Sequence, residues 1–262
     1  MKRIFITGAS SGIGLALAKH YAAQGAVLGL VARSRERLDQ LISTLPGAEH
    51  HRIYDVDVAD HQALAKAAND FISTYGGTDV VIASAGISLG TLTEYAEDFA
   101  VFERIIATNL LATVATFSPF IATMKAQAKA GSQICRLVGI GSVAGMRGLP
   151  GAEAYSASKA AVISYCESLR LELKKSGVKV ITVVPGYIDT PMTQVNTYRM
   201  PFLMPVEKFA KQAVAQIDEG CSYRVIPWQM GVVAKVLKVL PNSLYDLMFS
   251  NAPHKIRAHQ KP

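Results

Sequence analysis

The stretch that decides the fold lies near the start of the chain: Lys2-Arg3-Ile4-Phe5-Ile6-Thr7-Gly8-Ala9-Ser10-Ser11-Gly12-Ile13-Gly14-Leu15-Ala16-Leu17. Residues 2–7 form a short apolar run with β-branched members, which is typical of a buried strand. A glycine-rich turn follows and leads into a segment with helical periodicity. This order predicts a phosphate site, because unpaired backbone N–H groups and the dipole at the start of a helix both favour an anion.

The spacing of the glycines limits which class of phosphate ligand the turn could bind. Gly8, Gly12 and Gly14 form Gly-x-x-x-Gly-x-Gly, one residue longer than the usual dinucleotide motif. The turn lacks the Gly-Lys-Ser/Thr ending of a P-loop, which argues against an ATPase. Glycines there would let the backbone approach a pyrophosphate. An ordinary turn without a ligand is the alternative, but the position at the first turn of an alternating chain favours the dinucleotide.

Strand-like and helix-like segments alternate along the rest of the chain. The sequence predicts further strands at 26–32, 51–56, 79–83, 133–140, 178–184 and 224–226, and helices that include 35–45, 61–74, 98–128 and 152–175. Near-continuous apolar strands separated by helices predict an α/β fold, a Rossmann-type doubly wound parallel sheet of about seven strands with helices on both faces. Ligands of such sheets bind beyond the carboxyl ends of the strands.

Length and composition favour one large core. The chain has 262 residues, of which half are apolar. We expect residues 1–227 to form the sheet domain, with a lid at about 190–206, and residues 228–262 to form a helical extension of it. Two short apolar helices in the extension could close a pocket, join a subunit interface or lie on a membrane surface. Pocket or interface is favoured, because short helices with few charges anchor poorly in a membrane.

Charge, cysteines and hydropathy argue against several classes. The net charge is +7, but it is dispersed and no basic stripe carries aromatic residues, so nucleic-acid binding is not expected. Cys135, Cys166 and Cys221 are isolated and lack metal-ligand spacing, so we expect reduced thiols, no metal site and a cytoplasmic location. No secretory signal is evident, and no apolar run approaches the ~18 residues of a transmembrane helix.

The end of the second strand predicts the cofactor. About 20 residues after the glycine turn, an acidic residue would bind the ribose of NAD, whereas an arginine accommodates the 2′-phosphate of NADP. This chain has Ala32-Arg33-Ser34-Arg35 there and no carboxylate. The guanidinium of Arg33 could hold a phosphate in bidentate fashion, so we predict NADP(H) over NAD(H). Alternatively, these arginines only coat a solvated helix start.

A second pattern predicts proton-transfer chemistry. Tyr155 and Lys159 are four residues apart, which places them on one face of a helix about one turn apart. An ammonium beside a phenol favours the phenolate, so the tyrosine pKa is expected to fall below its reference value near 10. Such a tyrosine can pass a proton to or from an alcohol or carbonyl oxygen. Taken alone, the pair could also be an ion-pair face on a helix surface.

Together these features resemble the short-chain dehydrogenases/reductases, in their compact single-domain branch, as far as about residue 226. The glycine turn is similar to the family's cofactor motif, and Tyr155-x-x-x-Lys159 is similar to its active-site motif. Ser142 and Asn109 stand where the family has its catalytic serine and its helix asparagine. Two further segments match the family. Asp57-Val58 resembles the pair of residues that contacts the adenine of the cofactor, and Pro185-Gly186-Tyr187-Ile188-Asp189-Thr190 resembles the motif on the nicotinamide side.

The resemblance implies hydride transfer between a nicotinamide and a carbonyl carbon. Tyr155 would be the general acid in reduction and the base in oxidation, and Lys159 would lower its pKa and bind the nicotinamide ribose. Ser142 would hydrogen-bond the substrate oxygen, and Asn109 would hold a water that links Lys159 to solvent. The implied cofactor-binding residues are Gly8, Ser10, Ser11, Gly12, Ile13, Gly14, Arg33, Asp57, Val58, Ala85, Gly86, Tyr155, Lys159, Pro185, Gly186, Ile188 and Thr190.

The segment after Thr190 is expected to choose a small-molecule substrate. Apolar side chains there and near the active site favour an adaptable pocket for a hydrophobic ketone or aldehyde: Met146, Leu149, Tyr187, Met192, Tyr198, Met200, Phe202, Leu203 and Met204. Packing of the lid against the domain is an equal alternative for these residues.

Two other functions use the same motifs. One is an alcohol dehydrogenase working oxidatively, although NADP preference favours reduction in a cell. The other is an NADP-binding regulator without turnover, which the full set of Asn109, Ser142, Tyr155 and Lys159 argues against. A homodimer or homotetramer is expected, with the helices near 98–128 and 152–175 as candidate faces.

Overall fold

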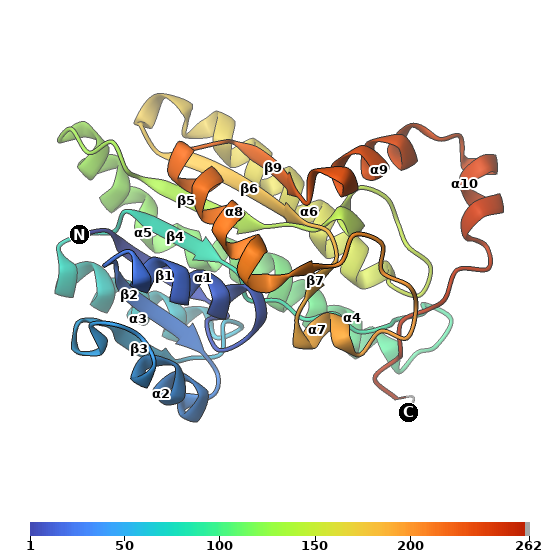
Figure 1. Ribbon diagram of the computed structural model, residues 1–262, viewed down its shortest axis with the longest axis horizontal. Helices are drawn as coiled ribbons and strands as arrows, with labels where there is room; N and C mark the ends of the chain where they lie inside the picture. The colour runs from blue at the N-terminus through green and yellow to red at the C-terminus, as the bar shows by residue number, and fades with distance from the viewer. Residues whose placement is uncertain (260–262) are drawn as a thin grey trace.

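The computed structural model describes residues 1–259 and contains a seven-stranded parallel sheet covered by helices (Figure 1). The strands lie in the order β3-β2-β1-β4-β5-β6-β9, and every neighbouring pair is parallel. The predicted doubly wound α/β class is confirmed. The strands are β1 (Arg3–Thr7), β2 (Val27–Ala32), β3 (Arg52–Asp55), β4 (Val80–Ala83), β5 (Arg136–Ile140), β6 (Lys179–Pro185) and β9 (Tyr223–Ile226).

The order of the strands determines where the expected ligand site lies. β1 lies between β2 and β4, so the chain moves outward to one edge of the sheet and then returns to build the other half. This reversal places the glycine turn after β1 beside residues 84–86, which follow β4. A crevice at such a point of reversal is the usual ligand site of open α/β sheets.

Alternating side chains on the strands give each face of the sheet its own core. Ile4 and Ile6 pack on one side with the helices α1 (Gly12–Ala23), α2 (Arg35–Ser43) and α8 (Val206–Glu219). Phe5 points to the other side, where its ring meets Phe71 and Phe120 at centroid distances of 5.5 and 4.9 Å. That side carries α3 (His61–Tyr75), α5 (Ala112–Lys129) and α6 (Glu153–Glu172).

The helix predicted over 98–128 is interrupted by a π-helical turn. It consists of α4 (Asp98–Ile106), the π segment Ala107–Leu111 and α5. The side chain of Asn109, inside the π segment, is fully buried. By length and composition alone, Asp98–Lys129 could cross a membrane, with a mean hydropathy of 1.7, although the sequence predicted no such span. In this fold it supplies core side chains that pack against the sheet, among them Phe117 and Phe120.

Several boundaries differ from the expected ones. The strand predicted from residue 133 begins at Arg136, because the Ser132 hydroxyl and the backbone of Ile134 hydrogen-bond in a local turn. Two short strands and a helix in or just before the expected lid were not predicted: β7 (Ile188–Asp189), α7 (Pro191–Gln194) and β8 (Met204–Pro205). Short 3₁₀ turns lie at Ala48–His50, Val143–Gly145 and Lys174–Ser176.

The expected tail helices are present. They are α9 (Trp228–Val239) and α10 (Asn242–Phe249). The division of the chain at residue 228 stays a prediction, and the last part of the expected extension, 260–262, lies outside the described residues.

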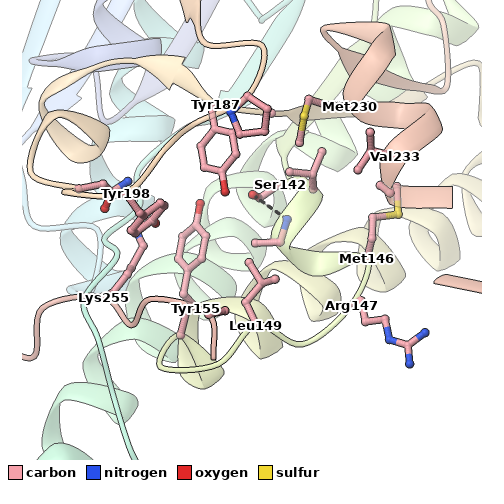
Figure 2. A pocket seen from close by; sticks show the side chains of 18 of the residues that line it. Ser142, Met146, Arg147, Leu149, Tyr155, Tyr187, Tyr198, Met230, Val233 and Lys255 are labelled. Carbon is pink, nitrogen blue, oxygen red and sulfur yellow. Dashed lines mark hydrogen bonds between the residues drawn. The ribbon is translucent and has the colours of Figure 1, made fainter. Parts of the chain in front are cut away.

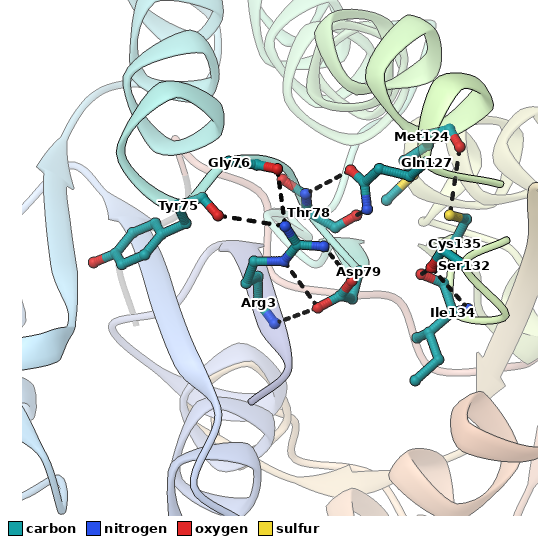
Figure 3. Close-up of polar contacts among 10 residues, drawn as sticks. All are labelled: Arg3, Tyr75, Gly76, Thr78, Asp79, Met124, Gln127, Ser132, Ile134 and Cys135. Carbon is teal, nitrogen blue, oxygen red and sulfur yellow. Dashed lines mark hydrogen bonds and ion pairs between the residues drawn. The ribbon is translucent and has the colours of Figure 1, made fainter. Parts of the chain in front are cut away.

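A polar cluster joins β1 to the segment before β4 (Figure 3). The carboxylate of Asp79 accepts hydrogen bonds from the Arg3 backbone N (2.8 Å), from Nε (3.1 Å) and from a terminal guanidinium nitrogen (2.7 Å). The other terminal nitrogen of Arg3 donates to the carbonyls of Tyr75 and Gly76 at 3.3 and 2.9 Å. This network fixes the start of β4 against β1, two strands that border the crevice.

Replacing Asp79→Asn should lower the free energy of unfolding by about 1–3 kcal/mol, because a part-buried guanidinium would lose its charged partner. Urea unfolding followed by circular dichroism measures the change. The matched control is Asp39→Asn, which breaks an exposed ion pair with Arg35 and should cost no more than about 0.5 kcal/mol. Equal losses in the two variants would contradict this account.

Candidate active site

A cavity of about 160 Å³, called here the glycine-turn cavity, opens at the carboxyl ends of the central strands. Most of the residues that sequence predicted to bind a cofactor line it: Gly8, Ser11, Gly12, Ile13, Gly14, Ala85, Gly86, Tyr155, Lys159, Pro185, Gly186, Ile188 and Thr190. The predicted residues outside its lining are Ser10, Arg33, Asp57 and Val58.

Glycine is required where the turn meets its neighbours. Gly8 has φ +70°, and a Cβ on it would lie 2.8 Å from the Cα of Ala85. A Cβ on Gly14 would overlap the carbonyl oxygen of Gly8. The backbone therefore forms a cradle without side chains at the N-terminus of α1, which fits the pyrophosphate of a dinucleotide.

The arginines after β2 have different partners. Arg35 is engaged by the carboxylates of Asp39 at 3.1 Å and Asp55 at 3.9 Å. Arg33 is exposed at the carboxyl end of β2, and within residues 1–259 its guanidinium has no hydrogen bond or ion pair. Of the three clustered arginines, Arg33 stands at the position where the 2′-phosphate of NADP was expected.

Asp57 and Val58, which are expected to contact the adenine, both have contacts within the fold. Asp57 is exposed, and its carboxylate accepts a hydrogen bond of 3.0 Å from the backbone N of Ala59. Val58 is buried in the core beneath α3. The carboxylate of Asp57 is therefore exposed where a ligand could reach it.

Lys159 reaches the cavity from α6 through a buried stem. Its Nζ donates a hydrogen bond of 2.8 Å to the carbonyl of Ile140, at the end of β5. Burial lowers the pKa of Lys159 to about 8. A Cβ on Gly86 would lie 3.7 Å from this nitrogen, so the loop after β4 forms the opposite wall.

The pKa of Tyr155 is shifted in the direction opposite to the one expected from the Tyr-Lys spacing. Burial raises its pKa above the usual value, and a hydrogen bond with Ser142 only partly opposes the shift. The Nζ of Lys159 is 5.9 Å from the centre of the Tyr155 ring and is already bonded to a carbonyl. At that distance the ammonium does not offset the cost of burying a phenolate, so Tyr155 holds its proton at neutral pH.

Asn109 braces two parts of the site. Its Nδ2 donates to the carbonyl of Ile87 (3.0 Å) and to the hydroxyl of Ser158 (2.9 Å), while its Oδ1 accepts from the backbone N of Ile87 (2.9 Å). The Ser158 hydroxyl in turn donates to the carbonyl of Tyr155 at 2.8 Å. The amide therefore ties the loop after β4 to the helix of Tyr155. The predicted water link to Lys159 stays a prediction.

A second cavity of about 470 Å³, called here the apolar cavity, lies beside the first (Figure 2). Tyr155 and Tyr187 point toward one another across it (Figure 2). Of the predicted pocket residues, Met146, Leu149, Tyr187, Met192 and Tyr198 line it, whereas Met200, Phe202, Leu203 and Met204 do not. The alternative for these residues was packing of the lid against the domain. The last four support it only in part, since Met204 is buried while Phe202 and Leu203 are exposed.

The tail helices close this cavity. Met230, Val233, Ala234 and Leu237 of α9 contribute to the lining, as does Phe249 of α10. Of the three alternatives for the tail, the structure supports pocket closure. The opposite sides of both helices expose apolar side chains, namely Trp228, Val232, Val236, Val239, Leu244, Leu247 and Met248.

The two cavities share a wall. Ser142 and Tyr155 line both of them, and so do Gly186, Met192 and Thr193. A group bound in the glycine-turn cavity would meet a group bound in the apolar cavity at the hydroxyls of Ser142 and Tyr155. This arrangement suits the transfer of a small unit between two ligands, with a proton donor at the point of contact.

Sequence reasoning missed Lys255 as a member of the site. Its side chain lines the apolar cavity and lies 5.0 Å from the centre of the Tyr155 ring. No spacing rule connects residues so far apart in the chain, so only the path of the tail shows the contact. Among residues 1–259 no three His, Cys, Asp or Glu side chains gather as a metal site, and Cys135, Cys166 and Cys221 are unpaired.

Comparisons with known proteins agree with this geometry. A family model described as short chain dehydrogenase matches residues 2–200. Over 245 residues the chain is 35% identical to an uncharacterized oxidoreductase of Myxococcus xanthus (strain DK1622), covering 92% of this chain and 93% of that protein.

Two solved structures share the fold. One is a 3-ketoacyl-(acyl-carrier-protein) reductase from Brucella melitensis complexed with NADH, with a TM-score of 0.76, 22% identity, and 86% of this chain and 96% of that chain covered. The other is an alcohol dehydrogenase from the archaeon Thermococcus sibiricus complexed with 5-hydroxy-NADP, with a TM-score of 0.74, 23% identity and the same coverage of 86% and 96%.

The match to the family model spans the glycine turn, Ser142, Tyr155 and Lys159, which the fold brings to one end of a Rossmann-type sheet. The Myxococcus relative extends the similarity almost from end to end. This protein therefore belongs to the short-chain dehydrogenase/reductase family of oxidoreductases.

Proposed function

We propose that this protein is an NADP(H)-dependent reductase of hydrophobic ketones or aldehydes. The observation that carries the proposal is the wall shared by the two cavities, on which Ser142 and Tyr155 face both sides. A cofactor in the glycine-turn cavity and a substrate in the apolar cavity would meet at a proton donor.

The residues of the glycine-turn cavity fit a nicotinamide dinucleotide. The cradle formed by Gly8, Gly12 and Gly14 would hold the pyrophosphate, and the exposed carboxylate of Asp57 is available for the adenine end. Arg33 supports NADP(H), because it is a guanidinium with no partner within residues 1–259 at the place of the 2′-phosphate. The related structures were solved with one or the other form, so the choice rests on Arg33.

Each site residue has one task in this mechanism. The bound nicotinamide would supply the hydride in reduction and accept it in oxidation. Tyr155 would donate its phenolic proton to the oxygen of the substrate carbonyl, and its raised pKa keeps that proton in place at neutral pH. Ser142 would donate a hydrogen bond to the same oxygen as negative charge develops on it. Lys159 would stabilise the phenolate left on Tyr155.

The apolar cavity supports the substrate class. Its lining is mainly aliphatic and aromatic, with Met146, Leu149, Met192 and Met230 near the shared wall. Such a surface takes an apolar body, and flexible methionines let it adapt to differing shapes. Screening NADPH oxidation over aliphatic, aromatic and long-chain carbonyl compounds tests the proposal, and it fails if none is reduced.

Tyr155→Phe should lower kcat for carbonyl reduction at least about a hundredfold, because the general acid is lost. The affinity for NADPH, measured by its fluorescence on binding, should change little. Tyr165→Phe on the same helix is the matched control, since Tyr165 packs against Phe117 away from both cavities. Comparable activity in the Tyr155 and Tyr165 variants would show that Tyr155 is not the proton donor.

Arg33→Ala should reduce the preference for NADPH over NADH about tenfold to a hundredfold, because a charge-assisted contact with the 2′-phosphate is removed. The ratio of kcat/KM values for the two cofactors measures this preference. Arg35→Ala should change it less, since that guanidinium is engaged by Asp39 and Asp55. An unchanged ratio in the Arg33 variant would refute the assignment to NADP(H).

A further inference from the structure

The segment 250–259 runs from α10 back toward the start of α4 (Figure 1). Ala252, Pro253 and Lys255 of this segment line the apolar cavity. Arg257 anchors it, since its Nε donates to the Asp98 carboxylate at 2.7 Å and a terminal nitrogen donates to Glu97 at 3.1 Å. The guanidinium also lies 3.6 Å from the centre of the Tyr95 ring. The backbone N of Gly90 donates to the carbonyl of Ile256 at 3.0 Å, which adds a short β-bridge. These contacts hold the segment in one place.

The anchored segment directs Lys255 into the cavity (Figure 2). Its Nζ donates a hydrogen bond to the hydroxyl of Ser88 and lies 5.0 Å from the centre of the Tyr155 ring. Burial lowers the pKa of Lys255 to about 8, so at neutral pH it still carries its charge. Within residues 1–259, no carboxylate forms an ion pair with it.

The other cations of the cavity have different roles. The guanidinium of Arg147 donates to the carbonyls of Leu237 (2.6 Å) and Leu240 (2.7 Å) and to the side chain of Asn242 (2.9 Å), so it closes the end of α9. Arg199 is exposed at the rim. Lys255 is thus the cation that enters the cavity with only a neutral hydroxyl as its hydrogen-bond partner in the described chain.

An ammonium with no counter-charge in an apolar cavity is costly, and an anion that entered beside it would remove much of that cost. We propose that Lys255 binds a carboxylate of the substrate, so that the protein acts on aldehyde or keto acids with an apolar body. The inference rests on the proposed function for the reacting carbonyl group. It adds a second anchor, because the carbonyl would sit at Tyr155 and the carboxylate at Lys255, which together orient the substrate.

The test compares aldehyde acids of increasing chain length with their methyl esters. For wild type, kcat/KM should be about tenfold to a hundredfold higher for an acid than for its ester, because only the acid makes the charge-assisted contact. Lys255→Met should abolish this preference, whereas Lys255→Arg should keep much of it. Lys235→Met, an exposed lysine of α9 outside the cavity, is the matched control and should keep the wild-type ratio.

An acid-to-ester ratio that is the same in wild type and Lys255→Met would overturn the proposal, because no carboxylate would then bind at Lys255. If both kcat/KM values fell while the ratio stayed constant, Lys255 would act on Tyr155 instead. Where the methionine variant folds poorly, equal kcat/KM values for acid and ester in wild type would still refute the carboxylate site.

A binding measurement separates this proposal from the proposed function. Titration calorimetry with octanoate and octanamide needs no turnover, and octanoate should bind wild type about tenfold or more tighter than octanamide, with the difference lost in Lys255→Met. If that result is obtained while no carbonyl compound is reduced, the carboxylate site stands and the proposed reaction fails. Equal binding of octanoate and octanamide to wild type would refute the carboxylate site.

Discussion

The rest of the structure depends on how closely the backbone after β1 approaches the backbone after β4. Any side chain at Gly8 would bring its Cβ to 2.8 Å from the Cα of Ala85, and one at Gly14 would strike the carbonyl of Gly8. Glycine at these points lets α1 start directly at the crevice between the strands. The same approach holds the loop after β4 against Lys159 and Asn109, so the positions of both depend on it.

Local pattern was enough for the sheet, because each strand is a short apolar run and each helix has its own periodicity. It also located the glycine turn and the Tyr155–Lys159 pair, because each lies within a few consecutive residues, whereas Ser142 came from the resemblance to the family. Local pattern was not sufficient where a property depends on groups far away in the sequence. The pKa of Tyr155 depends on how deeply the ring is buried, which the spacing to Lys159 does not contain. The π turn at Asn109 accompanies hydrogen bonds to Ile87 and Ser158 across the fold.

Burial sets the chemistry of the site more than any pairing of charges. Lys159 is buried and Tyr155 and Lys255 are half-buried, and in each the neutral form is favoured: the phenol keeps its proton and the two ammonium groups lose theirs more readily. Hydrogen bonds to the Ile140 carbonyl and the Ser88 hydroxyl hold the lysines in place without neutralising them. The site is therefore positively charged around an uncharged tyrosine, an arrangement that favours negative charge on whatever binds there.

Met192 and Thr193, on the short helix after β7, belong to the walls of both cavities. A ligand in the glycine-turn cavity that contacts this helix would fix part of the surface that a ligand in the apolar cavity contacts, and the reverse also holds. Occupancy of the two cavities is then linked by a coupling free energy, and linkage requires each ligand to change the affinity of the other by the same factor. In kinetic terms, whichever ligand binds first would complete part of the binding surface for the second.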